Sequence, residues 1–384
     1  MRRYPVFLLA LGLGLVCGCS TPPDPSPNYH EYAYITNGTG NTVTVVDLRA
    51  LRIIKTIGVG RSPTGIAANP RRNEIYVVNT ESNNVSVIDA QTNKVVSVIG
   101  VHRAPYFVSV SGDGRRAYVA NSGSANLSVI DLDERKVIRT IQVGYGSDRA
   151  EVTPDGKMAI VVLSEEDSVA IVDTEKLALR SKIKTCGRPG PLSFLPDSSK
   201  AFLTCSAGNQ VAVIDLKSER LLTLLDVGKT PIDIAMKPDG GEVFVFNWGG
   251  GSVSEIITGS NEVNNSFLIG EQPVRGLVSR DNSILFVSNF GSDSVAIYSI
   301  DNGRRLGVTG VGSHPEAMAF SPNQLLLLVV NAVSNDLAVV ALTDRKGHPW
   351  PDDKPQGGPW YPLETMVPLG GNPREIVIKA FVAP

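Results

Sequence analysis

The side chains best suited to chemistry recur in short segments that lead into a proline or lie beside one. These segments carry cations and imidazoles, with fewer carboxylates, among which Glu316 is the one closest to a histidine. If the fold gathers the segments around one opening, they form a cationic funnel for an anionic small molecule or polymer. Ordinary solvated loop charge is the alternative interpretation, and the one favoured by the modest basic excess. The basic members are Arg61, His102, Arg103, Arg149, Arg188, Lys229, Arg275, His314 and Arg374, and the opposing carboxylates are Asp148, Asp233, Glu271, Glu316 and Glu375.

Large aromatic side chains interrupt the same pattern at a few places. Trp248 and Phe290 stand in NWGGGS and NFGSDS, where corresponding segments carry small residues, and Tyr106 follows a linker proline. Aromatic rings beside arginines can stack on a ring-bearing ligand. They can also cover a neighbouring loop, which is the favoured interpretation.

Signals for catalysis and metal binding are weak. The chain has four histidines, and it contains no H-E-x-x-H, G-x-S-x-G or C-x-x-C-H motif. The best set for an enzyme is Arg275, His314 and Glu316 on adjacent linkers, and axial haem ligation by His102 or His314 is a further, less favoured possibility. The sequence therefore predicts no catalytic residues, no metal and no cofactor.

The four cysteines divide into two pairs. Cys17 and Cys19 lie near the N-terminus, whereas Cys186 enters one repeated unit and Cys205 ends the second strand of that unit. Neighbouring antiparallel strands place the start of one beside the end of the other, and an exported protein meets an oxidising compartment. We expect a Cys186–Cys205 disulfide, which stabilises the fold by roughly 3 kcal/mol in the chain-entropy model.

An internal repeat positions all these residues. Asparagine recurs at multiples of 42 residues, with Leu163 and Cys205 at the two missing places, and the segment EIYVVNTESNNVSVID returns as RAYVANSGSANLSVID. Each period contains four short apolar stretches separated by turn residues, which is typical of a propeller blade. The recurring asparagines suit strand ends, where the amide can bond nearby backbone. The series is Asn37, Asn79, Asn121, Asn247, Asn289 and Asn331.

The sequence predicts an all-β propeller of four-stranded antiparallel blades. Eight second strands and eight first strands can be counted, so we expect eight blades, with seven as the alternative. The chain enters on a second strand, YAYITN, and leaves on a first strand, NPREIVIKAF. The C-terminal strand is therefore expected to complete the N-terminal blade and close the ring without a free edge.

The repeats YVVN and YVAN, with the downstream SVID and the VG-x-x-P linker, resemble the YVTN family of β-propeller repeats, of the YncE-like or surface-layer type. The resemblance covers about residues 32 to 384 and implies the fold more than any chemistry. Propellers with similar repeats include lactonase-like hydrolases and redox-accessory proteins associated with haem or quinone enzymes, and some hold haem d1.

Three segments lie outside or interrupt the repeats. Residues 1–18 resemble a lipoprotein signal peptide that ends before Cys19, the expected lipidation site, and residues 19–31 form a Pro-rich tether. The propeller spans 32–384. Within it, the Pro- and Trp-rich stretch 343–364 is an insertion between the third and fourth strands of the last unit, on the face opposite the channel mouth or at the outer rim. Its aromatics either fold back on the blade or contact a partner.

The overall charge argues against a polyanionic partner such as nucleic acid. Lys plus Arg is 36 and Asp plus Glu is 38. The favoured interpretation is an exported, lipid-anchored, non-catalytic binding or scaffold module of the cell envelope, held in the outer membrane and facing the periplasm or cell surface. Its partner is an envelope protein, a glycan or a small ligand. The alternative is a lactonase-like hydrolase or a redox-accessory propeller.

Overall fold

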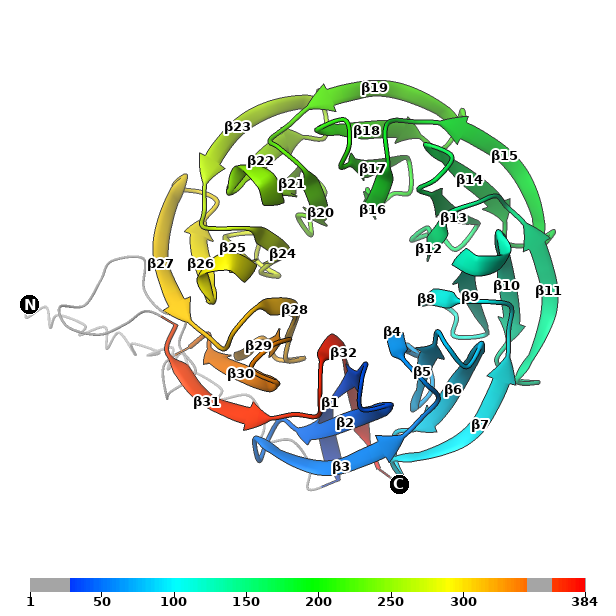
Figure 1. The fold of residues 1–384 in the computed structure, drawn as a ribbon. Coiled ribbons are helices and arrows are strands. Elements are labelled where there is room, and N and C mark those ends of the chain that lie inside the picture. The colour runs from blue at the N-terminus through cyan, green and yellow to red at the C-terminus, as the bar shows by residue number, and fades with distance from the viewer. Residues whose placement is uncertain (1–27, 344–360, 384) are drawn as a thin grey trace, which may run out of the picture.

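A computed structural model describes residues 28–343 and 361–383. It shows eight four-stranded antiparallel sheets arranged around a central axis (Figure 1), which confirms the predicted eight-bladed propeller. The signal segment, most of the tether and most of the insertion lie outside the described residues. Among the helices of the described part of the chain, none has the length and apolarity needed to cross a membrane.

The strands follow one another in four-stranded units, numbered here as blades in chain order. Blade 1 holds β1 (Tyr29–Asn37), β2 (Thr42–Asp47), β3 (Arg52–Gly58) and the last strand, β32 (Pro373–Val382). Blade 2 holds β4 (Pro63–Ala68), β5 (Glu74–Asn79), β6 (Asn84–Asp89) and β7 (Lys94–Gly100). Blade 3 holds β8 (Pro105–Val110), β9 (Arg116–Asn121), β10 (Asn126–Asp131) and β11 (Lys136–Gln142). Blade 4 holds β12 (Ser147–Val152), β13 (Met158–Leu163), β14 (Ser168–Asp173) and β15 (Ala178–Lys184).

The second half of the ring repeats the pattern. Blade 5 holds β16 (Pro189–Phe194), β17 (Lys200–Cys205), β18 (Gln210–Asp215) and β19 (Arg220–Asp226). Blade 6 holds β20 (Pro231–Met236), β21 (Glu242–Asn247), β22 (Ser252–Ile257) and β23 (Glu262–Leu268). Blade 7 holds β24 (Pro273–Val278), β25 (Ile284–Asn289), β26 (Ser294–Ser299) and β27 (Arg304–Gly310). Blade 8 holds β28 (Pro315–Phe320), β29 (Leu326–Asn331), β30 (Asp336–Ala341) and β31 (Leu363–Pro368).

The hydrophobic core lies between blades and not within them. The second and third strands of each blade are buried along almost their whole length, whereas the outermost strands alternate between buried and exposed residues. One core cluster combines Tyr34 of blade 1 with Ile75 and Val77 of blade 2, and the other clusters likewise join neighbouring blades. A single blade has two apolar faces, so only stacking around the axis removes both from water.

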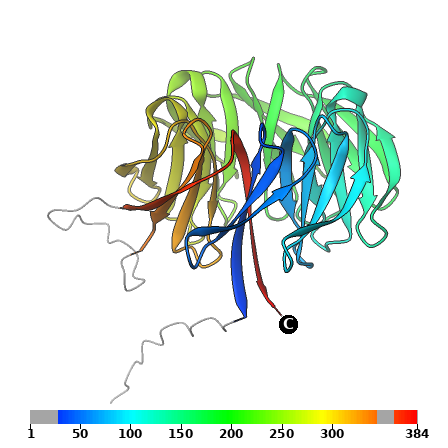
Figure 2. The same cartoon turned by 60° about the horizontal axis from the view of Figure 1, so that its bottom comes forward.

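Two chain ends close the ring. β1 pairs with β32 in antiparallel register from Tyr29↔Val382 to Asn37↔Pro373, as the sequence predicts. The two strands are longer than the innermost strands of other blades and project below the ring (Figure 2). β1 therefore has a partner strand on each side, β2 and β32.

The recurring asparagines fix the second strand to the third. The amide nitrogen Nδ2 of Asn79 donates to Asn84 Oδ1 at 2.8 Å and to Ser86 Oγ at 2.9 Å. Bonds to nearby backbone, which the sequence suggested, occur for Asn121 and Asn289. In most blades, serine, threonine, aspartate or asparagine side chains five or seven residues later are the acceptors. A linker glycine packs against the amide in every such blade except that of Asn121, and a Cβ at Gly60 would lie 2.7 Å from the side chain of Asn79.

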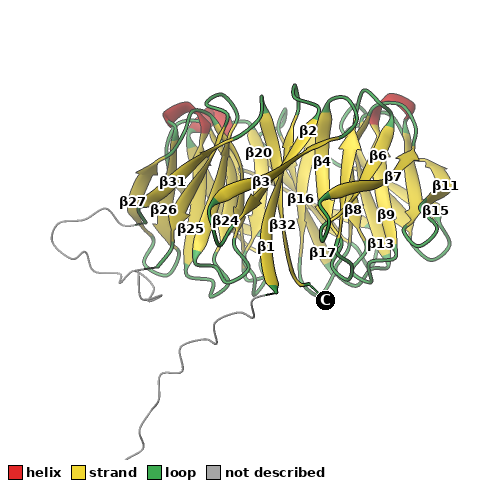
Figure 3. Cartoon of the chain, turned by 90° about the horizontal axis from the view of Figure 1, so that it is seen from below, coloured by secondary structure: helices red, strands yellow, loops and turns green. Residues whose placement is uncertain are grey.

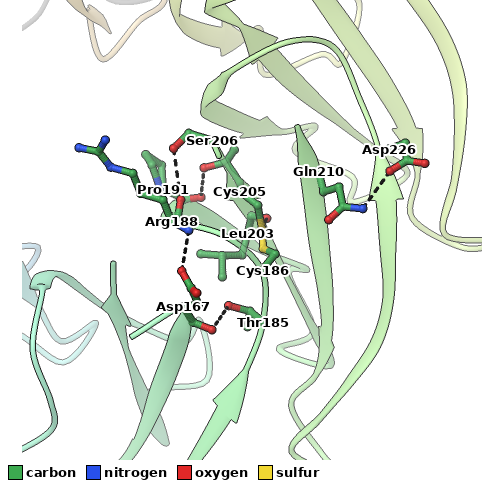
Figure 4. The surroundings of a disulfide bond; sticks show 11 residues. Asp167, Thr185, Cys186, Arg188, Pro191, Leu203, Cys205, Ser206, Gln210 and Asp226 are labelled. Carbon is green, nitrogen blue, oxygen red and sulfur yellow. Dashed lines mark hydrogen bonds between the residues drawn. A yellow bond between two sulfur atoms is a disulfide. The ribbon is translucent and has the colours of Figure 1, made fainter. Parts of the chain in front are cut away.

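The same position in blade 5 carries the disulfide. Cys186 and Cys205 are bonded, with their Cα atoms 5.7 Å apart, at places that hold glycine and asparagine in other blades (Figure 4). Both cysteines are buried. A covalent bond therefore replaces a packing contact between linker and strand.

Candidate functional site

One face of the ring, called here the top, carries the three short 3₁₀ helices η1 (Ser122–Ser124), η2 (Trp248–Gly250) and η3 (Phe290–Ser292) (Figure 3). The linkers between blades join the ends of the outermost strands to the innermost strands at this face. The innermost strands run downward from it, so their first residues surround the upper end of the channel.

A cavity of about 220 Å³ occupies this upper end. Its walls come from the second and third residues of innermost strands in different blades, because strand alternation turns the third residue toward the axis. The charged members include Arg149, Asp233, Arg275, Glu316, Arg374 and Glu375.

Ion pairs cross the cavity between blades. The guanidinium of Arg275 lies 3.0 Å from Glu375 Oε1 and 3.7 Å from Asp233 Oδ1. Glu375, assisted by Asp233, raises the pKa of Arg275 above its usual range, so this cation is held firmly charged. Because Arg275 already has two carboxylate partners, it has little attraction left for a ligand anion.

The carboxylates beneath the mouth are held in a desolvated setting. Burial raises the pKa of Asp233, and the nearby Arg275 opposes that shift. Burial also raises the pKa of Glu316, with the negative charge of Glu375 adding to the effect. Glu151, one layer below, has its pKa raised by burial despite an ion pair at 3.1 Å with Arg149.

One guanidinium of the cavity lining, that of Arg374, remains available to a ligand, whereas Arg149 is already paired with Glu151. Arg374 lines the cavity and forms no ion pair with any residue that the structure describes. Arg149 is partly exposed, and its Cζ lies 4.2 Å from the ring centroid of Phe107, a cation–π contact.

Aromatic side chains line part of the rim. Trp248 and Phe290 begin the short helices η2 and η3, with ring centroids 5.1 Å apart. Phe290 stacks on His314 at 4.1 Å, and the backbone N–H of His314 donates to Asp293 Oδ1 at 2.9 Å. The three rings therefore form a row across blades 6, 7 and 8.

The structure separates the predicted site residues into groups. Tyr106, Arg149, Arg275 and Glu316 line the cavity. Trp248, Phe290 and His314 stand on the rim, where they contact one another. The remaining candidates are linker residues outside the cavity lining, and their backbones lie at the exposed top: Arg61, His102, Arg103, Arg188 and Lys229.

His102 illustrates why linker position alone was a poor guide. Its Nε2 lies 3.0 Å from the hydroxyl of Thr140 on the outermost strand β11, so the imidazole is directed away from the axis. His102 and His314 are thus not brought together. Asp233, Arg374 and Glu375 were counted among the linker charges but not singled out as site residues. The signal that could have done so is their place as second or third residue of an innermost strand.

An eight-bladed β-propeller with a charged, partly aromatic channel mouth is the class that fold and site define. Residues 69–322 match the family described as the cytochrome D1 heme domain, and the chain belongs to this family. No curated protein matches the chain.

Solved structures support the fold. Hydrazine synthase from Kuenenia stuttgartiensis is similar with a TM-score of 0.58 and 22% identity, over 73% of this chain and 95% of that one. The dihydro-heme d1 dehydrogenase NirN, in complex with DHE, has a TM-score of 0.72 and 15% identity, over 90% and 74%. A functionally unknown protein from Desulfotomaculum acetoxidans DSM 771 has 0.57 and 17%, over 90% and 98%.

The family implies a tetrapyrrole, and the mouth meets part of what such a group requires. Arg374 can pair with a carboxylate on the edge of the ring, and Trp248 and Phe290 offer apolar faces. The cavity itself is smaller than the roughly 300 Å³ at which sites for drug-sized ligands begin, so it can admit a side arm and not the ring.

The cavity lining offers no comparable partner for the iron that such a ring can carry. No histidine, cysteine or methionine side chain is among the described residues that line the cavity. Nδ1 of the rim residue His314 is buried without a hydrogen-bond partner in the described structure, whereas histidines that ligate metals normally donate from their second nitrogen. The residues therefore fit a carboxylate-bearing ring across the mouth, and they do not fit iron ligation within the channel.

Proposed function

We propose that this chain is an exported, lipid-anchored member of its family that binds a carboxylate-bearing tetrapyrrole across the top mouth. It acts as a binding or accessory protein, and its YVTN-like repeats supply a rigid platform. The redox chemistry is that of the bound group, while the residues of this chain hold its edge and one face. A protein or glycan partner, the alternatives left open by the sequence, is secondary to this ligand because of the family membership.

One observation carries the proposal: a guanidinium without an ion pair, Arg374, lies at a mouth rimmed by aromatic rings. A partly buried cation favours an anion more strongly than a fully solvated one does. A neutral residue at position 374 should remove one charge-assisted hydrogen bond, which weakens binding roughly 10- to 100-fold. Arg275, with its two carboxylate partners, is not expected to contribute in the same way.

Tryptophan fluorescence provides the assay. The chain has three tryptophans, and replacement of Trp350 and Trp360 by Phe leaves Trp248 at the mouth as the reporter. The purified W350F/W360F protein is titrated with metal-free protoporphyrin IX and with iron protoporphyrin IX. We expect micromolar or tighter quenching by both, with affinities within a few-fold of each other.

The matched variants are R374A and R103A, since Arg103 is an exposed linker arginine outside the cavity lining. Weaker binding in R374A alone supports the proposal. Absence of binding, or equal loss in both variants, contradicts it. Binding that requires iron and disappears in H314A would show that the imidazole ligates the metal, against the geometry described above.

A further inference from the structure

The bottom of blades 1 and 2 carries a set of unpaired cations around the chain termini. We propose that this surface docks on an anionic phospholipid bilayer, so that the channel mouth faces away from the membrane. The surface, called here the basal patch, consists of Tyr29, Arg49, Arg52, Arg71 and Val382. It is separate from the channel mouth and does not depend on the ligand proposed there.

The centre of the basal patch is the projecting end of the β1–β32 ribbon (Figure 3). In other blades the innermost strand turns back at the bottom, whereas here both strands continue and end side by side, with Ala383 N donating to Asn28 O at 2.8 Å. Val382 is 61% exposed at this end, and Tyr29 is half-buried beside it. An exposed apolar residue and a tyrosine at a protruding tip suit the boundary between headgroups and acyl chains.

Two basic turns are attached to the ribbon. Arg49 donates to the backbone oxygen of Tyr29 at 3.3 Å, and the same turn leads to Arg52 at the start of β3. On the other side, the buried Lys379 of β32 donates to Asn69 O at 2.6 Å, which ties the ribbon to the turn that carries Arg71. The ribbon and both turns therefore form one continuous surface.

The three arginines are exposed, and none forms an ion pair with a described residue. The neighbouring acids have other hydrogen-bond partners. Glu31 is buried and accepts from the Tyr29 hydroxyl, and Asp47 accepts the backbone N–H groups of Arg49 and Ala50. Arg72, in contrast, is paired with Asp133 and is left out of the patch.

The position of the first described residues, at the bottom of the ring, favours a bilayer as the partner. Cys19, the expected lipidation site, is nine residues before Asn28. Nine residues reach at most about 30 Å even when fully extended. Because β1 starts at the bottom, an anchor at Cys19 holds the basal patch within that distance of the membrane, and the top with Trp248 and Phe290 lies on the other side of the ring.

The test uses the chain from Ser20 onward, so that no acyl chain contributes. Cosedimentation is measured with vesicles of phosphatidylcholine alone and of phosphatidylcholine with phosphatidylglycerol. Each cation near an anionic surface strengthens binding roughly fivefold. We expect binding to the anionic vesicles, loss of more than about 100-fold in R49E/R52E/R71E, and weakening by added salt.

The control is R103E/R188E/K229E, which makes the same charge change at exposed residues of the top face. Selective loss in the basal variant supports the proposal. Failure of the wild-type chain to bind anionic vesicles, or equal loss in both variants, overturns it. Thermal melting of both variants establishes that they are folded, and porphyrin titration of vesicle-bound protein reports separately on the mouth.

Discussion

Replacement of Arg275 by methionine tests whether the channel is held together by its buried charges. Arg275 is 24% exposed and Asp233 9% exposed in their side chains, so the pair is largely removed from water. Removing one partner of a buried pair typically destabilises a protein by 3–5 kcal/mol, because the other charge stays buried without compensation. Glu375 is 36% exposed and can be hydrated in part, so we expect the lower end, about 3 kcal/mol.

The expected loss converts to a measurable melting shift. With about 2.1 cal/mol/K per residue, the entropy of unfolding for a chain of this length is about 0.8 kcal/mol/K, so R275M should melt about 4 °C lower at pH 8. Acidification should reduce the difference. Burial already raises the pKa of Asp233, and without Arg275 the native state binds a proton still more readily, so R275M gains stability as the pH falls.

The assay is thermal melting of wild type, R275M, D233N and D233N/R275M between pH 5 and pH 8. The double variant should be more stable than R275M, because it removes the uncompensated carboxylate. An R275M protein that melts like the wild type at pH 8, or one whose deficit does not change with pH, would refute the reasoning.

Three further predictions concern other parts of the ring. C186A/C205A should lower the free energy of unfolding, measured by denaturant titration, by about 3 kcal/mol. C186G/C205N, which restores the glycine–asparagine contact of other blades, should recover part of that loss. An unchanged free energy of unfolding in C186A/C205A would contradict the structural role of the disulfide. G276A should destabilise by at least about 3 kcal/mol, since a Cβ there lies 1.9 Å from Phe246 Cζ, and F246L/G276A should melt higher than G276A; normal melting of G276A would contradict the packing. E316Q should stabilise at neutral pH, because burial raises the native pKa of Glu316 and the wild-type protein loses stability as the pH rises through that value; the advantage should shrink toward pH 4, and an advantage independent of pH would exclude this cause.

The sequence was sufficient to predict the ring because the same packing requirement applies to every blade. A second strand such as EIYVVN must be buried on both faces, and the repeat of 42 residues then fixes the number of sheets and the pairing of the two ends. The Cys186–Cys205 bond follows from the same register.

The site was harder to predict because the repeat does not show which side chains point toward the axis. His102 and Arg275 both lie in or next to a linker between blades. The imidazole of His102 contacts an outer strand, whereas the guanidinium of Arg275 reaches Glu375 in blade 1. The two side chains differ in direction because His102 precedes its innermost strand, whereas Arg275 is the third residue of one. The role of Glu375 could not be predicted either, because its partner Arg275 lies in a different blade and is distant in the sequence.

Closure by the two termini has a consequence for how the molecule is made. β1 pairs with β2 soon after both are synthesised, but its other neighbour, β32, arrives more than 300 residues later, since Tyr29 pairs with Val382. Until then an apolar edge stays open to any passing strand. Completion of blade 1 therefore has to wait for synthesis of β32 and, if the chain is exported, for its translocation, and loss of that strand leaves blade 1 with three strands.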